Sequence, residues 1–179
     1  MRRLALISLV MLSMVVLALA GAYMGIHRGR HPAHSPESTG VARPQDVMLT
    51  DLDGKHFRTS DYQGKVVLVN FWAAWCAPCA EEIPRFVAMQ NKYRARGLQV
   101  IGISVEDVES ELRSFCIKDH VNYPVVPGDQ TVADSFGGVL GLPTTILIGK
   151  DGTIYRKYSG ATDFAVLEHD ITPLLAAAR

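Results

Sequence analysis

The sequence has few cysteines, no excess of charge of either sign and no internal repeat. Three cysteines in 179 residues are too few for a disulfide scaffold, which packs many bridges into a short chain. The 18 basic and 18 acidic side chains cancel, which argues against a nucleic-acid partner, because phosphate binding needs a basic surface. With 48% hydrophobic residues the chain is also too apolar for a disordered protein. Its length suits one folded domain with additional segments.

The N-terminal region contains a long run without charge. Arg2 and Arg3 precede residues 4–26, which carry no charged side chain, and Arg28 follows them. A helix that spans a bilayer needs about 20 apolar residues, and this run of 23 is long enough. We therefore predict that residues 1–26 form a single-pass membrane anchor.

The same run also allows a cleaved signal peptide. Ala18-Leu19-Ala20 has the small residues of a cleavage site. No cysteine follows the run directly, which excludes lipid attachment at a new N-terminal cysteine. Arginines flank both ends, so the positive-inside rule does not choose an orientation. If the N-terminus stays in the cytoplasm, both alternatives place the rest of the chain on the other side of a membrane.

Residues 27–45 are poor in features that build a core. They contain three prolines and no apolar periodicity. Three of the six histidines also lie here, which leaves a metal-binding tract as an alternative. We predict a flexible linker at 27–45 and one compact domain at 46–179.

In the domain, patterns typical of strands alternate with patterns typical of helices. Strands are expected at 47–49 and 55–57, as a hairpin about Asp53-Gly54, and at 66–71, 98–105, 123–126, 144–148 and 153–158. Helices are expected at 76–96, 107–119, 132–136 and 163–177, the last capped by Asp163 and interrupted or frayed near Pro173. This alternation indicates an α/β fold around one mixed sheet.

The segment Cys76-Ala77-Pro78-Cys79 lies between a predicted buried strand and the start of a predicted helix. Unpaired amides and the dipole at a helix N-terminus stabilise a thiolate, so Cys76 is the candidate nucleophile. Pro78 falls in the first turn, where its missing N–H costs little. Two intervening residues let Cys79 reach Cys76 and close a small, reversible disulfide. We expect a redox centre here.

Residues 71–79, FWAAWCAPC, closely resemble the active-site signature of thioredoxins. A second segment, residues 141–145 (GLPTT), resembles the thioredoxin loop whose proline is cis and packs beside the dithiol. The resemblance implies a cis peptide at Pro143, whereas position alone also allows a trans proline at the start of a strand. Pro84 matches the kinked active-site helix of the family.

The hairpin, the phrase CAEEIP and the phrase GLPTTILI are similar to the TlpA/ResA-type branch of the redoxin family, over residues 46–175. That branch holds membrane-anchored or periplasmic thiol–disulfide oxidoreductases, several of which serve cytochrome c maturation. The resemblance implies a thioredoxin-like fold, with a central mixed sheet flanked by helices on both faces and an N-terminal β-hairpin. It also implies reduction of disulfides in exported proteins, re-reduction by a membrane electron donor, and no metal or dissociable cofactor besides the dithiol.

The resemblance also suggests roles for residues around the dithiol. Asn70 stands where general thioredoxins have a buried Asp, and Glu82 stands where the envelope branch often has a Glu. Because Glu82 is about one helical turn from Cys79, it is a candidate base for that thiol; the alternative is a solvated carboxylate such as Glu81. A flat apolar collar for the substrate is expected from Trp72, Trp75, Pro78 and Pro143, with core packing as the alternative for Trp72.

Three rival functions have weaker support in the sequence. A peroxidase of the peroxiredoxin type would need Pro and Thr where this chain has Val69 and Ala73. A metal-binding module would use Cys76, Cys79, Cys116 and His120 as ligands, but Cys116 falls on an apolar helix stripe, where a buried thiol is expected. A chaperone-like adaptor would not need two intact cysteines.

Overall fold

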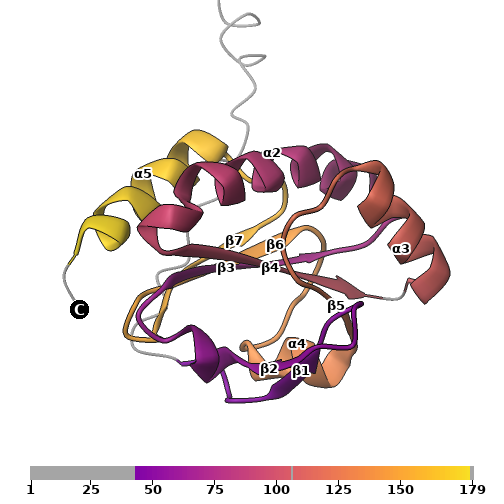
Figure 1. Cartoon of the computed structure of the whole chain (residues 1–179), viewed down its shortest axis with the longest axis horizontal. Helices are drawn as coiled ribbons and strands as arrows, with labels where there is room; N and C mark the ends of the chain where they lie inside the picture. Colours follow the sequence, from indigo (N-terminus) through magenta and orange to yellow (C-terminus); the bar gives the residue numbers. More distant parts are fainter. Residues whose placement is uncertain (1–42, 106, 178–179) are drawn as a thin grey trace, which may run out of the picture. The chain divides into compact units, whose positions relative to one another are not determined.

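A computed structural model of the chain describes residues 43–105 and 107–177 (Figure 1). The predicted anchor at 1–26 and most of the predicted linker lie outside the described residues. Across these two stretches, none of the helices has the length and apolar character needed to cross a membrane. In chain order the elements are β1 (Met48–Thr50), β2 (His56–Arg58), the 3-10 helix η1 (Thr59–Tyr62), β3 (Val66–Trp72), α2 (Ala77–Tyr93), η2 (Arg94–Arg96), β4 (Leu98–Val105), α3 (Glu109–Lys118), β5 (Val125–Gly128), α4 (Gln130–Ser135), β6 (Thr144–Ile148), β7 (Ile154–Ser159) and α5 (Phe164–Ala176).

The strands form a two-stranded sheet, β1-β2, and a five-stranded sheet in the order β5-β4-β3-β6-β7. Strands β3, β4 and β5 are parallel, while β6 and β7 run antiparallel to their neighbours. Figure 1 shows α2, α3 and α5 along one face of the large sheet, with α4 and the β1-β2 hairpin on the other. The predicted fold class is therefore confirmed: a thioredoxin-like mixed sheet covered by helices on both faces, with an N-terminal hairpin.

Strand β3 is the centre of the domain, and all seven of its residues are buried. Successive side chains of a strand point to opposite faces, so β3 supplies two cores. Val66, Leu68 and Trp72 pack with the α2 face, while Val67, Val69 and Phe71 pack with the α4 face. Burial on both faces explains why the strand reads as an apolar run rather than as an alternating pattern.

The two helices beside the redox segment are held firmly to the sheet and to each other. Gln90 of α2 accepts a hydrogen bond from the Val100 N–H of β4 at 2.6 Å. Phe86 of α2 packs against Phe164 of α5, with 5.0 Å between ring centroids. Asp163 caps α5 as predicted, because its carboxylate accepts from the Ala165 N–H at 2.9 Å. These contacts hold the middle and the C-terminal half of α2 to the sheet and to α5.

The predicted interruption of the last helix at Pro173 is wrong. Helix α5 continues through Pro173 to Ala176. A proline removes one N–H, and here the lost bond lies in the last turn, where the helix is about to end in any case. The Ala177 N–H still donates to the Pro173 carbonyl at 2.9 Å. Just before the predicted start of the domain, the Gln45 N–H donates to the Ser135 carbonyl of α4 at 2.8 Å.

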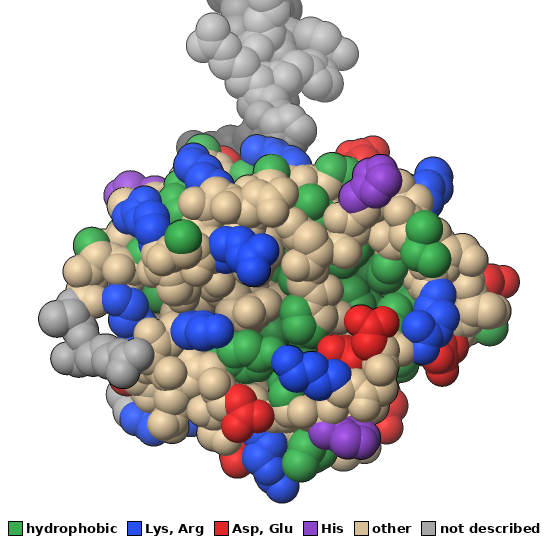
Figure 2. All heavy atoms as spheres, viewed as in Figure 1, with side chains coloured by type: hydrophobic (Ala, Val, Ile, Leu, Met, Phe, Trp, Pro, Cys, Tyr) green, Lys and Arg blue, Asp and Glu red, His purple; other side chains and the backbone are tan. Residues whose placement is uncertain are grey.

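The surface on the face shown in Figure 2 mixes charges of both signs. Lys and Arg side chains are scattered among Asp and Glu rather than gathered into one basic stripe. Such a surface offers no extended track for a polyanion on this face.

Candidate redox-active site

The structure joins Cys76 and Cys79 in a disulfide, with 5.2 Å between their Cα atoms. Cys76 is the N-cap of α2, and Cys79 lies in its first turn. Strand β3 ends at Trp72, and a turn in which the Cys76 N–H donates to the Ala73 carbonyl connects the two elements. The predicted pairing and its place between a buried strand and a helix are both confirmed.

The two sulfur-bearing residues differ in accessibility. Cys76 is 7% exposed and Cys79 is 1% exposed. The first turn of α2 contains no acidic residue that would offset the positive end of the helix dipole. A thiolate at position 76 is therefore both the more stabilised and the more reachable of the two.

Asp107 holds the loop that precedes Cys76, a role that was not predicted from the sequence. Its carboxylate accepts from the Ala74 N–H at 2.9 Å and from the Ser104 hydroxyl. Asp107 follows the end of β4, which runs parallel to β3, so the carboxyl ends of both strands lie at the same edge. Ligands and functional groups gather at that edge of parallel sheets, which is the signal that would have pointed to it.

The loop before β6 has the expected conformation. The Leu142–Pro143 peptide is cis, which confirms the expectation from the resemblance. The Pro143 carbonyl accepts from the Gly160 N–H at 2.9 Å. The Thr144 hydroxyl donates to the Gly141 carbonyl at 2.7 Å and closes the loop on itself.

The four predicted collar residues divide into two exposed and two buried side chains. Trp75 is 63% exposed and Pro78 is exposed, so both are available to a substrate chain. Trp72 is fully buried and packs against Phe115 at 5.0 Å between centroids, so its core-packing alternative is correct. Pro143 is also buried. Leu140, three residues before Pro143, is fully exposed and was not among the predicted collar residues.

Glu82 is buried, with only 5% of its surface exposed, whereas Glu81 is exposed. The alternative of a solvated carboxylate is therefore wrong for Glu82. One carboxylate oxygen accepts from the Thr162 N–H, and the other has no hydrogen-bond partner among the described residues. The pKa of Glu82 is raised, because burial disfavours the charged carboxylate. The hydrogen bonds from Thr162 and the charge of Arg85 lower the pKa but do not cancel this effect.

Known proteins resemble the chain in sequence and in fold. Residues 42–157 match the AhpC/TSA family. The chain is 30% identical over 163 residues to the thiol-disulfide oxidoreductase ResA of Bacillus cereus, covering 89% of this chain and 94% of that protein. The chain belongs to the AhpC/TSA family.

Within the AhpC/TSA family, the chain is a ResA-like thiol–disulfide oxidoreductase. It is 32% identical to ResA of Bacillus subtilis over 139 residues, which cover 77% of this chain and 76% of that one. Its fold resembles a thiol:disulfide interchange protein of the thioredoxin family from Chlorobium tepidum, with a TM-score of 0.70 and 27% identity. That match covers 76% of this chain and 98% of the other. The enzyme class expected from the CxxC segment is therefore confirmed.

The structure places the residues on which the peroxidase and metal-binding alternatives depend. Val69 and Ala73, which replace the proline and threonine of a peroxidase, are both fully buried and carry no hydroxyl. In the part of the chain that the structure describes, no three His, Cys, Asp or Glu side chains gather as metal ligands. Cys116 is partly buried against the α2-side core, and burial raises the pKa of its thiol to about 11. Such a thiol is a poor nucleophile and a poor metal ligand at neutral pH.

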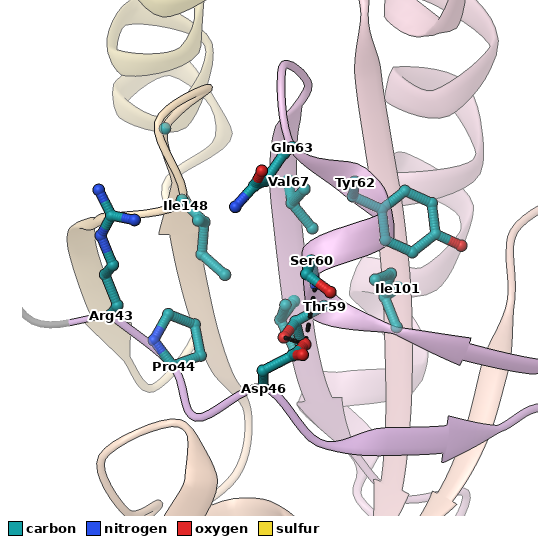
Figure 3. A pocket seen from close by; sticks show the side chains of 13 residues that line it. Arg43, Pro44, Asp46, Thr59, Ser60, Tyr62, Gln63, Val67, Ile101 and Ile148 are labelled. Atoms are coloured by element: carbon teal, nitrogen blue, oxygen red, sulfur yellow. Dashed lines mark hydrogen bonds between the residues drawn. The ribbon is translucent and has the colours of Figure 1, made fainter.

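One apolar cavity lies away from the dithiol. A cavity of about 180 Å³ is floored by Val67, Ile101 and Ile148 on the α4 face of the sheet (Figure 3). The Asp46 carboxylate, at its rim, accepts from the Ser60 N–H at 3.2 Å. No residue of the CxxC segment lines this cavity, so it does not form part of the redox site.

Proposed function

We propose that the protein reduces disulfides of exported proteins outside the cytoplasm, with Cys76 as nucleophile and Cys79 as resolving thiol. The observation that carries this proposal is the Cys76–Cys79 disulfide at the start of α2, with Cys76 the more exposed residue. Thiolate character and access decide which cysteine of a pair reacts first.

The reaction has two exchange steps. The Cys76 thiolate attacks one sulfur of the substrate disulfide, and the other substrate sulfur leaves as a thiolate. Cys79, once deprotonated, attacks the Cys76 sulfur and releases the second substrate thiolate. The substrate has then gained two electrons, its thiolates take up two protons, and the protein is left with the Cys76–Cys79 disulfide. The dithiol is itself the redox centre, so the cycle needs a two-electron donor and no dissociable cofactor.

Glu82 is the proposed base for the second step. Positions 79 and 82 lie about one turn apart on the same face of α2. Cys79 is sealed from solvent, and a thiol in apolar surroundings resists ionisation, so it needs an acceptor within the protein. The carboxylate oxygen of Glu82 that lacks a partner is available for that proton. Burial raises the pKa of Glu82, which makes it a stronger base than an exposed carboxylate.

The substrate chain is proposed to dock across Trp75, Pro78 and the Pro143 loop, with Trp72 supporting this surface from below. Trp75 and Leu140 expose large apolar side chains that a monomeric domain otherwise tends to bury. Exported proteins with disulfides are the proposed partners, and apocytochrome c is one candidate among them by family resemblance. A membrane electron donor is proposed to reduce the Cys76–Cys79 disulfide again after each cycle.

The place of action is proposed from the N-terminal sequence. Residues 4–26 are uncharged and long enough to hold the domain to the inner membrane, with residues 27–45 as the spacer. We expect the full-length protein to stay in the membrane fraction after a carbonate wash and to be cleaved by protease added from the periplasmic side. Recovery in the soluble envelope fraction, with a new N-terminus near Gly21, would show a cleaved signal peptide instead. Protection from the external protease would contradict the proposed side of the membrane.

A further inference from the structure

Four buried polar side chains connect α2 to the middle of the large sheet. Glu82, Thr162, Thr145 and Asn70 are each at most 9% exposed. The Asn70 side-chain N–H donates to the Thr145 hydroxyl at 3.1 Å, and the Thr145 and Thr162 hydroxyls are 3.3 Å apart. Thr162 in turn donates its backbone N–H to the Glu82 carboxylate. Polar groups are costly to bury without partners, so a connected set in a core calls for an explanation.

The chemistry of Asn70 gives this set a direction. An amide nitrogen can only donate, so the Thr145 hydroxyl accepts from Asn70. The single hydrogen of the Thr145 hydroxyl is then free to point to the Thr162 oxygen. Thr162 also donates its backbone N–H to the Glu82 carboxylate, and the Thr162 side chain, like that N–H, lowers the pKa of Glu82. All donors in the chain therefore point toward Glu82.

Hydrogen bonds that point toward a carboxylate favour its charged form, and a connected chain polarises each bond in it. Burial acts on Glu82 in the opposite sense and favours the neutral acid. Arg85 is the one charged side chain among the described residues that acts on this carboxyl group, from the next turn of α2. Without the hydrogen-bond chain, burial would favour the neutral form of Glu82 more strongly.

The strand register explains how the chain reaches the dithiol region. Asn70 and Thr145 are direct partners across the β3-β6 ladder, with both side chains on the α2 face. Thr145 comes two residues after Pro143, and Thr162 lies just before α5. The chain therefore ties the cis-proline loop, the central strand and the active-site helix together.

We propose that Asn70, Thr145 and Thr162 are positioning residues that form a directed hydrogen-bond chain and hold the Glu82 carboxylate charged and oriented within α2. Its consequence for turnover rests on the proposed role of Glu82 as base for Cys79. The chain itself is a property of the folded protein and is tested without turnover.

The test is a titration of the Glu82 side-chain carboxyl by NMR in full-length oxidised protein with isotope-labelled glutamate, assigned with Glu82→Gln. Thr145→Val keeps the shape and removes the hydroxyl without touching Glu82 directly. We expect the Glu82 midpoint to rise by about half a pH unit or more, because one relayed bond to the charged form is lost. Thr145→Ser, which restores a hydroxyl, should return the midpoint to near the wild-type value.

Thr144→Val is the matched control, because the Thr144 hydroxyl bonds the Gly141 carbonyl and lies outside the chain. Thr162→Val is a second variant should Thr145→Val not fold, and it should raise the midpoint as well. An unchanged midpoint in the folded valine variants would overturn the proposal, as would an equal rise in Thr144→Val. If the midpoint shifts but Glu82→Gln resolves mixed disulfides at the wild-type rate, the chain stands and the proposed base does not.

Discussion

The Cys79→Ser variant is expected to accumulate a mixed disulfide with a model substrate, and Cys76→Ser is not. With Cys79 absent, the intermediate formed by Cys76 has no thiol to resolve it. With Cys76 absent, the remaining thiol at position 79 is 1% exposed and is not at the N-cap of α2, so it reacts poorly with a protein disulfide. Both variants should lose multiple-turnover reductase activity.

Mass spectrometry of the protein after mixing with a disulfide peptide, under non-reducing conditions, measures this result. The adduct in Cys79→Ser should map to Cys76. Cys116→Ser is the control and should behave as wild type, because Cys116 is partly buried and burial raises its thiol pKa. An adduct that accumulates in Cys76→Ser and not in Cys79→Ser would reverse the assignment of the two thiols.

The Glu82→Gln variant is expected to resolve the mixed disulfide at least one order of magnitude more slowly than wild type. The amide keeps the shape of the side chain but cannot accept the proton of Cys79. General-base help is typically worth about 10²–10⁴-fold, so a tenfold loss is the lower bound for a group in that role. The measurement is single-turnover decay of the Cys76 mixed disulfide as a function of pH, and Glu81→Gln should remain near wild type. Superimposable profiles would leave Glu82 without a catalytic role.

The stability of Glu82→Gln is expected to be unchanged or higher at neutral pH. The Gln carbonyl can still accept from the Thr162 N–H, and a buried charge is removed. Because the folded-state pKa of Glu82 is raised, its protonated form is the better tolerated one. Its contribution to stability is therefore present below the unfolded pKa and is lost as the pH rises through the folded value. If Glu82→Gln resolves the mixed disulfide slowly but unfolds with the same free energy as wild type, the Glu82 carboxylate acts on the Cys79 thiol rather than on the stability of the fold.

The pattern of apolar residues predicted most of the strands and helices, because apolar side chains recur at the positions that face the core. Strand β3 is buried on both faces, and its continuous run of apolar residues marked it as central. The β1-β2 hairpin and β6-β7 were predictable from turn residues between short strands. The CxxC segment could be placed because a strand, two cysteines and a helix follow one another without a gap.

The features that sequence reasoning missed depend on contacts between distant segments. Asp107 lies 33 positions from the Ala74 N–H that it binds, and no local pattern joins the two. Thr162 and Glu82 are 80 positions apart, so no local pattern indicates that the Thr162 N–H binds the Glu82 carboxylate. Burial of Glu82 could not be read from α2 alone, because its neighbour Glu81 is also acidic yet exposed. Pro173 was wrongly expected to interrupt the last helix. A proline costs little in the last turn of a helix, and the sequence alone did not show that α5 ends at Ala176.

The reduction potential of the Cys76–Cys79 couple tests the central claim most directly. Full-length protein is equilibrated with thiol–disulfide buffers of graded potential, and the free thiols are alkylated and assigned by mass spectrometry. The account predicts one two-electron transition that involves Cys76 and Cys79 but not Cys116, near the thioredoxin value of about −270 mV. A potential near the strongly oxidising end, about −120 mV, would contradict the proposed reductase. The absence of a coupled transition of Cys76 and Cys79 would contradict the redox centre itself.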